Sequence, residues 1–192
     1  MEIKNAVVLI TGASSGIGEA TARAVVQAGA RAVLLARRQD RLDDLANELG
    51  NDVLTLPCDV TDPVEVQKAV QIAQERYGRI DVLINNAGQG LYASIEDIGI
   101  DDFRALLNLN TVAPLMMMQA VIPLMRKQGA GCIVNVSSGA TLATYPGAAA
   151  YTSSKSALNM ISKVARLELA EAGITVSLIH PFMTTTEFYG AV

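Results

Sequence analysis

What this sequence of 192 residues lacks already narrows its function. It contains no tryptophan, one histidine and two cysteines. The histidine, His180, has no neighbours that could complete a metal site, and no serine-hydrolase pattern surrounds it, so we interpret it as a residue at a strand end. Cys58 and Cys132 each lie in an apolar, strand-like run, which indicates buried free thiols in a reducing compartment. We therefore expect neither a metal site nor a disulfide.

Positive charge and long apolar runs are also scarce. The net charge is −4 without a basic block, so nucleic-acid binding has little electrostatic support. No apolar run reaches the roughly 18 residues that a membrane-spanning helix needs. The richest run, residues 112–125, is interrupted by Pro114 and Pro123. The N-terminal residues show no signal-peptide layout. The expectation is a cytoplasmic protein with no nucleic-acid or membrane partner.

What the sequence does contain is a regular alternation of short apolar runs and helical patterns. Hydrophobic residues make up 51% of the chain, which is typical of one packed domain, here spanning residues 1–192. Strands are predicted at 6–11, 31–36, 52–60, 80–88, 131–138 and 174–181, and helices at 17–29, 39–50, 62–78, 101–128 and 150–172. This alternation predicts an α/β fold: a three-layer, Rossmann-like, doubly wound parallel sheet that binds ligands at the carboxyl ends of its strands.

The stretch TGASSGIG, residues 11–18, joins the first predicted strand to the first helix. Gly12, Gly16 and Gly18 allow positive φ angles and let the backbone approach a pyrophosphate closely. The helix that follows presents its N-terminus, which favours an anion. Because the stretch lies between a predicted strand and a predicted helix, with the glycines in the turn, it indicates a dinucleotide site. The glycines alone would fit any strand-to-helix turn.

The residues after the second predicted strand discriminate between dinucleotides. An acidic residue there would hold a ribose 2′-hydroxyl, and an arginine would accommodate a 2′-phosphate. The sequence has Arg37 and Arg38 and no carboxylate, and Ser14 could add a hydroxyl. This favours NADP(H) over NAD(H); two solvated arginines that open a helix are the alternative.

Tyr151 and Lys155 are four residues apart and share one face of a predicted helix. An ammonium near a phenol favours the phenolate and so lowers the tyrosine pKa. Taken alone, the two residues would be an exposed helix pair, Ser138 an ordinary strand-end serine and Asn110 a polar group inside a helix. Only their joint occurrence with the glycine turn points to catalysis.

Together, TGASSGIG, NNAG at 85–88, the serine thirteen residues before the tyrosine, and YTSSK at 151–155 closely resemble the short-chain dehydrogenase/reductase family. The resemblance covers essentially the whole chain. It is nearest to the compact branch that includes ketoacyl reductases and hydroxysteroid dehydrogenases. The extended branch of sugar-nucleotide epimerases has a tighter glycine spacing.

The resemblance implies catalytic roles for four residues. Tyr151 would be the general acid/base, and Lys155 would lower its pKa and hold the nicotinamide ribose. Ser138 would hydrogen-bond the substrate oxygen. Asn110 would anchor a proton-relay water near the lysine; Asn108 is the competitor, but a small residue three positions later fits the family pattern for Asn110.

The resemblance also implies which residues bind the cofactor. They lie in the glycine turn, at the strand ends and after the sixth strand: Gly12, Ser14, Ser15, Gly16, Ile17, Gly18, Arg37, Arg38, Asp59, Val60, Asn86, Ala87, Gly88, Tyr151, Lys155, Pro181, Thr184 and Thr186. Two features depart from the family. Phe182 stands where a glycine is usual, and members usually continue past the position of Val192 through a helical segment and a seventh strand. We therefore expect the C-terminal part of the fold to be missing.

The resulting prediction is an NADP(H)-dependent oxidoreductase that interconverts an apolar ketone or aldehyde and an alcohol, with Tyr151 as general acid/base. A non-catalytic, dinucleotide-sensing binding protein is the alternative, and a sugar-nucleotide epimerase or dehydratase is disfavoured by the glycine spacing. Residues 89–100 are predicted to form one wall of the substrate pocket. By resemblance, we expect a homodimer or homotetramer that pairs the helix around 114–125 and the Tyr151 helix.

Overall fold

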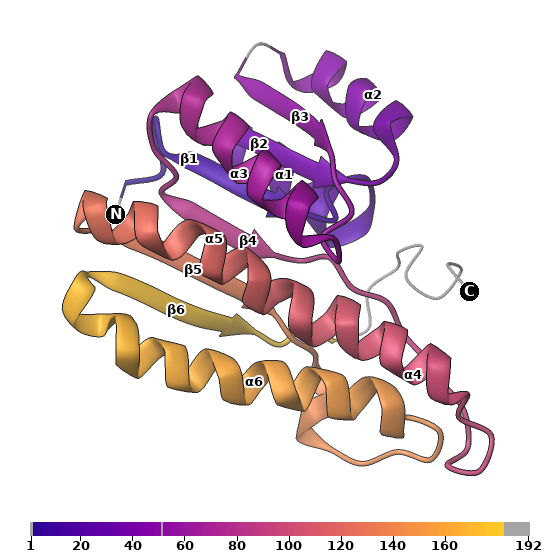
Figure 1. Ribbon diagram of the computed structural model, residues 1–192. Coiled ribbons are helices and arrows are strands. Elements are labelled where there is room, and N and C mark those ends of the chain that lie inside the picture. Colours follow the sequence, from indigo (N-terminus) through magenta and orange to yellow (C-terminus); the bar gives the residue numbers. More distant parts are fainter. Residues whose placement is uncertain (1, 51, 183–192) are drawn as a thin grey trace.

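The computed structural model describes residues 2–50 and 52–182, and six parallel strands form its centre (Figure 1). The strands are β1 (Val7–Thr11), β2 (Arg31–Ala36), β3 (Val53–Pro57), β4 (Val82–Asn85), β5 (Gly131–Val136) and β6 (Ile174–Ile179), in the spatial order β3-β2-β1-β4-β5-β6. The order reverses between β1 and β4, which pair through Leu9 and Leu83. Such a switch point opens a crevice at the carboxyl ends of the strands. The predicted fold class is confirmed.

Helices cover both faces of the sheet. The main ones are α1 (Gly16–Gln27), α2 (Gln39–Leu49), α3 (Pro63–Tyr77), α4 (Ile100–Leu107), α5 (Ala113–Gln128) and α6 (Ala149–Leu169). Short 3₁₀ turns η2 (Gly139–Leu142) and η3 (Ala170–Ala172) flank α6. Figure 1 shows α3, α5 and α6 over one face.

Side chains that alternate along the strands divide the core into two layers. Val7 and Leu9 of β1 pack into the cluster that includes α3, α5 and the end of α6. Val8 and Ile10 point to the other face and pack with α1 and α2. All five β1 residues are therefore buried, as expected for a central parallel strand.

The helix predicted at 101–128 is interrupted. A π-helical turn, Asn108–Val112, separates α4 from α5. Pro114 has no N–H, so the α-helical bond back to the Asn110 carbonyl cannot form, which favours irregular backbone at this position. By length and apolar composition the continuous segment Ile100–Gln128 could cross a membrane. Its Met117 and Met125 are instead fully buried against the sheet, as in the core helix of a globular domain.

Candidate active site

A cleft of about 890 Å³ runs along the carboxyl ends of the strands, across the switch between β1 and β4. Most of the predicted site residues line it: Gly12, Ser14, Ser15, Gly16, Ile17, Arg37, Arg38, Asp59, Val60, Asn86, Ala87, Gly88, Ser138, Tyr151, Lys155 and Pro181. Gly18 and Asn110 lie behind its wall rather than in it, while Asn108 lines it. Thr184 and Thr186 lie outside the described residues.

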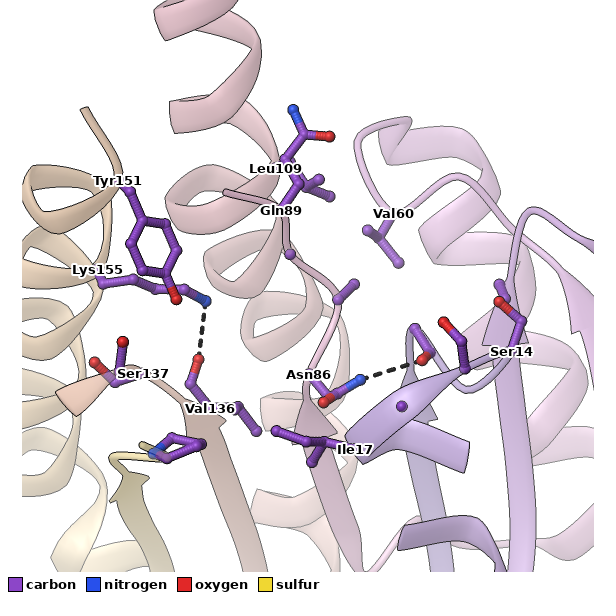
Figure 2. A pocket seen from close by; sticks show the side chains of 18 of the residues that line it. Ser14, Ile17, Val60, Asn86, Gln89, Leu109, Val136, Ser137, Tyr151 and Lys155 are labelled. Atoms are coloured by element: carbon purple, nitrogen blue, oxygen red, sulfur yellow. Dashed lines mark hydrogen bonds between the residues drawn. The ribbon is translucent and has the colours of Figure 1, made fainter. Parts of the chain in front are cut away.

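The glycine turn is built by close backbone packing at one end of the cleft. Gly12 and Gly16 have φ angles of 66° and 58°, which glycine adopts at little cost. A Cβ on Gly18 would overlap the Gly12 carbonyl oxygen and lie 2.5 Å from Nδ2 of Asn86. That amide in turn donates to the carbonyl of Thr11 (3.0 Å) and to the carbonyl of Gly12 (3.2 Å; Figure 2). The strand end of β4 therefore holds the turn in place.

The N-terminus of α1 opens toward the cleft. Ser15 is its N-cap residue and is fully extended (φ −166°), and among the described side chains none caps the helix there. The first N–H groups of the helix are thus available to an anion, which the positive end of the helix dipole also favours. The turn and the helix end together fit a pyrophosphate group.

Arg38 reaches back over the same turn. Its guanidinium donates to Oγ of Ser14 (3.0 and 3.2 Å) and to Oγ of Ser15 (2.8 Å). The guanidinium cation and the two serine hydroxyls therefore lie together. Such a group of hydrogen-bond donors is suited to binding a phosphate. The neighbouring Arg37 is exposed and also lines the cleft.

Asp59 and Cys58 line the same end of the cleft as the two arginines. The Thr61 hydroxyl and N–H donate to the Asp59 carboxylate at 2.7 and 2.9 Å, and these bonds, with a smaller contribution from Arg37, hold the pKa of Asp59 below its usual value. Burial, aided by nearby carboxylates, raises the pKa of Cys58 to about 12, so this thiol stays protonated. Cys58 is buried, as predicted, whereas Cys132 is only half-buried, which the apolar run around it did not reveal.

The other end of the cleft is built from side chains of α6. Tyr151 and Lys155 are almost fully buried, and Figure 2 shows both entering the same part of the cleft. Nζ of Lys155 donates to the carbonyl of Val136, at the end of β5, over 2.9 Å. Burial lowers the pKa of Lys155 to about 8. This ammonium therefore titrates much closer to neutral pH than an exposed lysine does.

Asn110 lies in the π-helical turn and is fully buried. Its Oδ1 accepts from the N–H of Gln89 at 3.0 Å, and its Nδ2 donates to the carbonyl of Gln89 at 2.9 Å and to Oγ of Ser154 at 3.1 Å. A Cβ on Gly88 would lie 3.0 Å from Oδ1 of Asn110 and 3.2 Å from Nζ of Lys155. Asn110 thus fixes the chain after β4 and lies on the same side of Gly88 as the lysine.

Ser138 follows β5 and opens the turn η2. Its Oγ accepts from the N–H of Ala140 at 3.1 Å, which leaves the hydroxyl hydrogen available to a ligand in the cleft. Its carbonyl is contacted by the hydroxyl of Thr141 (2.8 Å) and by Nδ1 of His180 (3.2 Å). The strand-end histidine of the sequence analysis therefore touches the backbone of a predicted catalytic residue.

Two further features of the site were not predicted. The Tyr92 ring, in the segment 89–100 that was expected to form a wall of the substrate pocket, lies 6.2 Å from the Tyr151 ring, centroid to centroid. Under the site, the amide of Asn85 donates to Oδ1 of Asn135, whose own amide donates to Oγ of Ser162, so that a buried polar chain connects β4, β5 and α6. A buried asparagine in an apolar strand was the available signal for this chain, because buried amides need hydrogen-bond partners. No comparable local pattern marks the contact between Tyr92 and Tyr151.

Comparison with known proteins agrees with this geometry. A family model described as short chain dehydrogenase matches residues 6–192. An uncharacterized oxidoreductase of Staphylococcus aureus is 36% identical over 96% of this chain and 80% of its own length, and one of Staphylococcus saprophyticus is 40% identical over 96% and 76%.

Solved structures agree as well. A 3-ketoacyl-(acyl-carrier-protein) reductase from Brucella melitensis, complexed with NADH, is similar with a TM-score of 0.94 at 29% identity, over 97% of this chain and 79% of its own. A short-chain dehydrogenase from Streptomyces avermitilis has a TM-score of 0.91 at 36% identity, over 96% and 69%. On this fold, this site and these matches, the chain belongs to the short-chain dehydrogenase family of oxidoreductases.

Proposed function

We propose that this protein is an NADP(H)-dependent oxidoreductase that interconverts a ketone or aldehyde and an alcohol. One observation carries the proposal: Tyr151, Lys155 and Ser138 line the same cleft as an anion-binding glycine turn, at its opposite end. A dinucleotide bound with its pyrophosphate on the turn would extend toward these three side chains. A bound nicotinamide would supply or accept the hydride.

In this proposal, residues of the cleft transfer a proton to or from the substrate oxygen. In the reductive direction the Tyr151 hydroxyl gives a proton to the substrate oxygen, and in the oxidative direction the phenolate takes it back. The ammonium of Lys155 favours the phenolate over the phenol, because opposite charges attract in a buried site. The hydroxyl of Ser138 donates a hydrogen bond to the same substrate oxygen, where negative charge develops.

Two of these roles have support in the hydrogen bonds already described. The Ser138 hydroxyl accepts one bond from the backbone and so keeps its hydrogen for the substrate. The Lys155 ammonium donates one hydrogen to Val136 and retains two further hydrogens. In this proposal these face the dinucleotide ribose and the water held by Asn110.

Turnover tests this proposal directly. NADPH absorbance would be followed with a panel of uncharged ketones for the wild type, Tyr151→Phe and Tyr145→Phe. We expect Tyr151→Phe to lose about 10³-fold in kcat, since general acid–base catalysis contributes about 10²–10⁴-fold. Tyr145→Phe, which alters another tyrosine of the same cleft, should keep its activity. Equal turnover of wild type and Tyr151→Phe would overturn the mechanism; tight NADPH binding with no turnover would favour a binding protein.

The preference for NADP(H) rests on Arg38 and its two serine partners. The structures similar to this chain include one complexed with NADH and one in complex with NAD, so the preference is a property to be measured on this chain. We expect NADPH to bind at least tenfold more tightly than NADH. Arg38→Asp should reverse the order and Arg37→Asp should weaken it, because both remove a cation from the position of the 2′-phosphate. Unchanged preference in both variants would remove the arginines from the proposal.

Besides the small-molecule substrate, we propose a second copy of this chain as a binding partner. Helices α5 and α6 enclose a mostly apolar groove lined by Leu115, Met118, Gln119, Ile122, Met160, Ile161, Val164, Ala165, Glu168 and Leu169. Met160 is 60% exposed and Val164 44%. A second copy of the chain could cover both helices around a two-fold axis. Light scattering of the wild type and of Met160→Glu, at cytoplasmic pH and under reducing conditions, tests this: the wild type should be a dimer or tetramer and the variant smaller.

A further inference from the structure

Charge is distributed unevenly along the cleft. Arg37, Arg38 and Asp59 all lie at the end that would hold the adenosine part of the dinucleotide. Beyond Gly88, toward Tyr151, Lys155 is the one charged group among the described lining residues, and it is only 3% exposed. Among the residues that the structure describes, the reaction end therefore presents no exposed ion to a substrate.

Aromatic side chains are concentrated at this same end. The residues that the structure describes include six aromatic side chains, and four of these line the cleft: Tyr92, Tyr145, Tyr151 and Phe182. Tyr151 is buried, whereas Tyr92 is 50% exposed, Tyr145 59% and Phe182 78%. Large exposed apolar surfaces in a concave site mark ligand contacts more often than structural ones.

Tyr92 has a special position among the four. Its ring lies 6.2 Å from that of Tyr151 with an interplanar angle of 32°, within the range of favourable aromatic pairs. The chain that carries it is fixed, because the backbone of Gln89 is bound on both sides by Asn110 and the N–H of Ala93 donates to the carbonyl of Gly147. One part of the ring thus packs toward the predicted acid/base, and half of its surface remains open.

We propose that Tyr92 is the specificity-determining residue of this site and holds a flat, aromatic group of an uncharged carbonyl substrate beside Tyr151. The inference rests on the proposed function and narrows its substrate class. An aromatic ketone would bury its ring on the open part of Tyr92 while its oxygen meets Tyr151 and Ser138. A carboxylate beside the carbonyl would lose its hydration in a cleft end whose described residues offer no exposed cation in return.

Two matched substrate pairs test the inference. Acetophenone and cyclohexyl methyl ketone differ in ring aromaticity, and methyl phenylglyoxylate and phenylglyoxylate differ in charge. For the wild type we expect kcat/KM about tenfold higher for the first member of each pair. Tyr92→Leu should abolish the aromatic preference, and Tyr92→Phe, which keeps the ring, should retain it. Tyr145→Leu is the control for a nonspecific loss of apolar surface.

A binding measurement separates specificity from chemistry. Calorimetric titration of acetophenone into the enzyme saturated with NADP⁺ should show about tenfold weaker binding for Tyr92→Leu and unchanged binding for Tyr92→Phe. A wild type that turns over no ketone would overturn the proposed function. A wild type that turns over ketones with equal kcat/KM within each pair, or a Tyr92→Leu variant that keeps the aromatic preference, would overturn the role of Tyr92 alone.

A separate set of contacts concerns the backbone of Ser138. Three elements meet there: His180 after β6, Thr141 in η2 and Asn159 in α6. The Ser138 carbonyl accepts from the Thr141 hydroxyl at 2.8 Å and lies 3.2 Å from Nδ1 of His180, which must donate because a carbonyl can only accept. The amide of Asn159 donates to the Thr141 oxygen at 3.2 Å, and its Oδ1 accepts from Ser137 at 2.6 Å.

We infer that His180 is a positioning residue for Ser138, with its Nδ1–H holding the serine carbonyl so that the hydroxyl meets the substrate oxygen. This inference also rests on the proposed function. His180→Leu removes the donor, while His180→Asn places an amide N–H near the same position. We expect kcat about tenfold lower in His180→Leu, with NADPH affinity and substrate KM nearly unchanged, and recovery in His180→Asn.

The outcome distinguishes positioning from a general structural role. A loss of folding would lower the melting temperature of His180→Leu and raise the Kd for NADPH together with the loss of kcat. Thr141→Val, which removes the second donor to the same carbonyl, should reproduce the loss of kcat. Unchanged kcat in His180→Leu, or a loss that His180→Asn does not restore, would overturn the inference while leaving the proposed function intact.

Discussion

The two ends of the cleft are built in different ways. The glycine-turn end is mainly a backbone structure: two positive φ angles and a helix N-terminus lie within residues 12–18, and one distant side chain, the amide of Asn86, fixes them. The reaction end is mainly a side-chain structure, in which α6 contributes Ser154 and Lys155, the π-helical turn contributes Asn110, and the end of β5 contributes a backbone carbonyl. The first kind of site is mostly local in sequence, and the second depends on the packing of elements far apart in sequence. Four predictions test this contrast.

The largest effect is expected from Lys155→Met, at the reaction end. We expect a loss of about 10³-fold in kcat, because the charge that supports Tyr151 is removed. Unfolding free energy at pH 7 should nevertheless rise by about 1–2 kcal/mol, since the folded protein no longer buries an ammonium. Chemical denaturation and NADPH-coupled turnover measure the two quantities, and a variant that is both inactive and less stable would contradict the prediction.

Gly18→Ala tests the backbone end. The added methyl group overlaps the Gly12 carbonyl and the Asn86 amide, so the turn must shift; NADPH affinity should fall about 30-fold, as expected for overpacking of 1–3 kcal/mol. Gly78→Ala is the control: Gly78 has a positive φ of 76°, which Gly18 does not have, but there is open space around the added carbon. It should cost about 1 kcal/mol of stability and leave NADPH binding unchanged, as measured by fluorescence titration. Equal losses of affinity would contradict the packing argument.

Asn110→Leu tests whether the π-helical turn fixes the chain after β4. The substitution leaves the N–H and carbonyl of Gln89 without their partners, at a cost of about 2 kcal/mol in unfolding free energy. Asn108→Leu, two residues earlier in the same turn but exposed, should change stability by less than about 0.5 kcal/mol. Thermal unfolding of both variants gives the comparison, and equal destabilisation would show that the amide of Asn110 has no special role.

The smallest effect concerns pH. Since burial lowers the pKa of Lys155 to about 8, the ammonium loses its proton as the pH rises through that value. Reductive kcat/KM should therefore fall about tenfold between pH 7 and 9. Wild-type stability should rise between about pH 8 and the unfolded pKa of 10.5, because there the unfolded chain binds more protons than the folded one. The Lys155→Met variant should show neither change.

The sequence predicted the architecture well because the fold depends on patterns that are local. Each predicted strand and helix lies within a few residues of its observed position, since apolar runs and glycines mark the sheet and its turns. The fourth strand is the exception: a run predicted at 80–88 pairs only over Val82–Asn85, because Asn86 turns away to bind the glycine turn. An apolar run predicts a strand, but it does not predict the hydrogen bond that ends this strand at Asn85.

The site was only partly predictable for the same reason. Ser14 and Arg38 were predicted on one phosphate position, and the structure joins them by hydrogen bonds. The contacts of Tyr92 and His180 depend on loops that return to the site from different strands. Their side chains follow no spacing rule, and His180 was interpreted only as a strand-end residue. Long-range packing decides such contacts, and a single sequence carries little information about it.

The π-helical turn also has a consequence for chain register. An α-helix advances by 100° per residue, so a turn with i→i+5 bonds holds one residue more than a regular helix would. The additional residue is accommodated within this one turn, so the faces of α4 and α5 keep nearly the relation that they would have in one regular helix. If residues 108–112 were all kept but adopted regular α-helix, α4 would rotate by about 100° relative to α5, and an exposed face of α4 would be directed at the sheet. The π-helical turn therefore lets the chain carry one more residue here without turning the buried face of α4 away from the core.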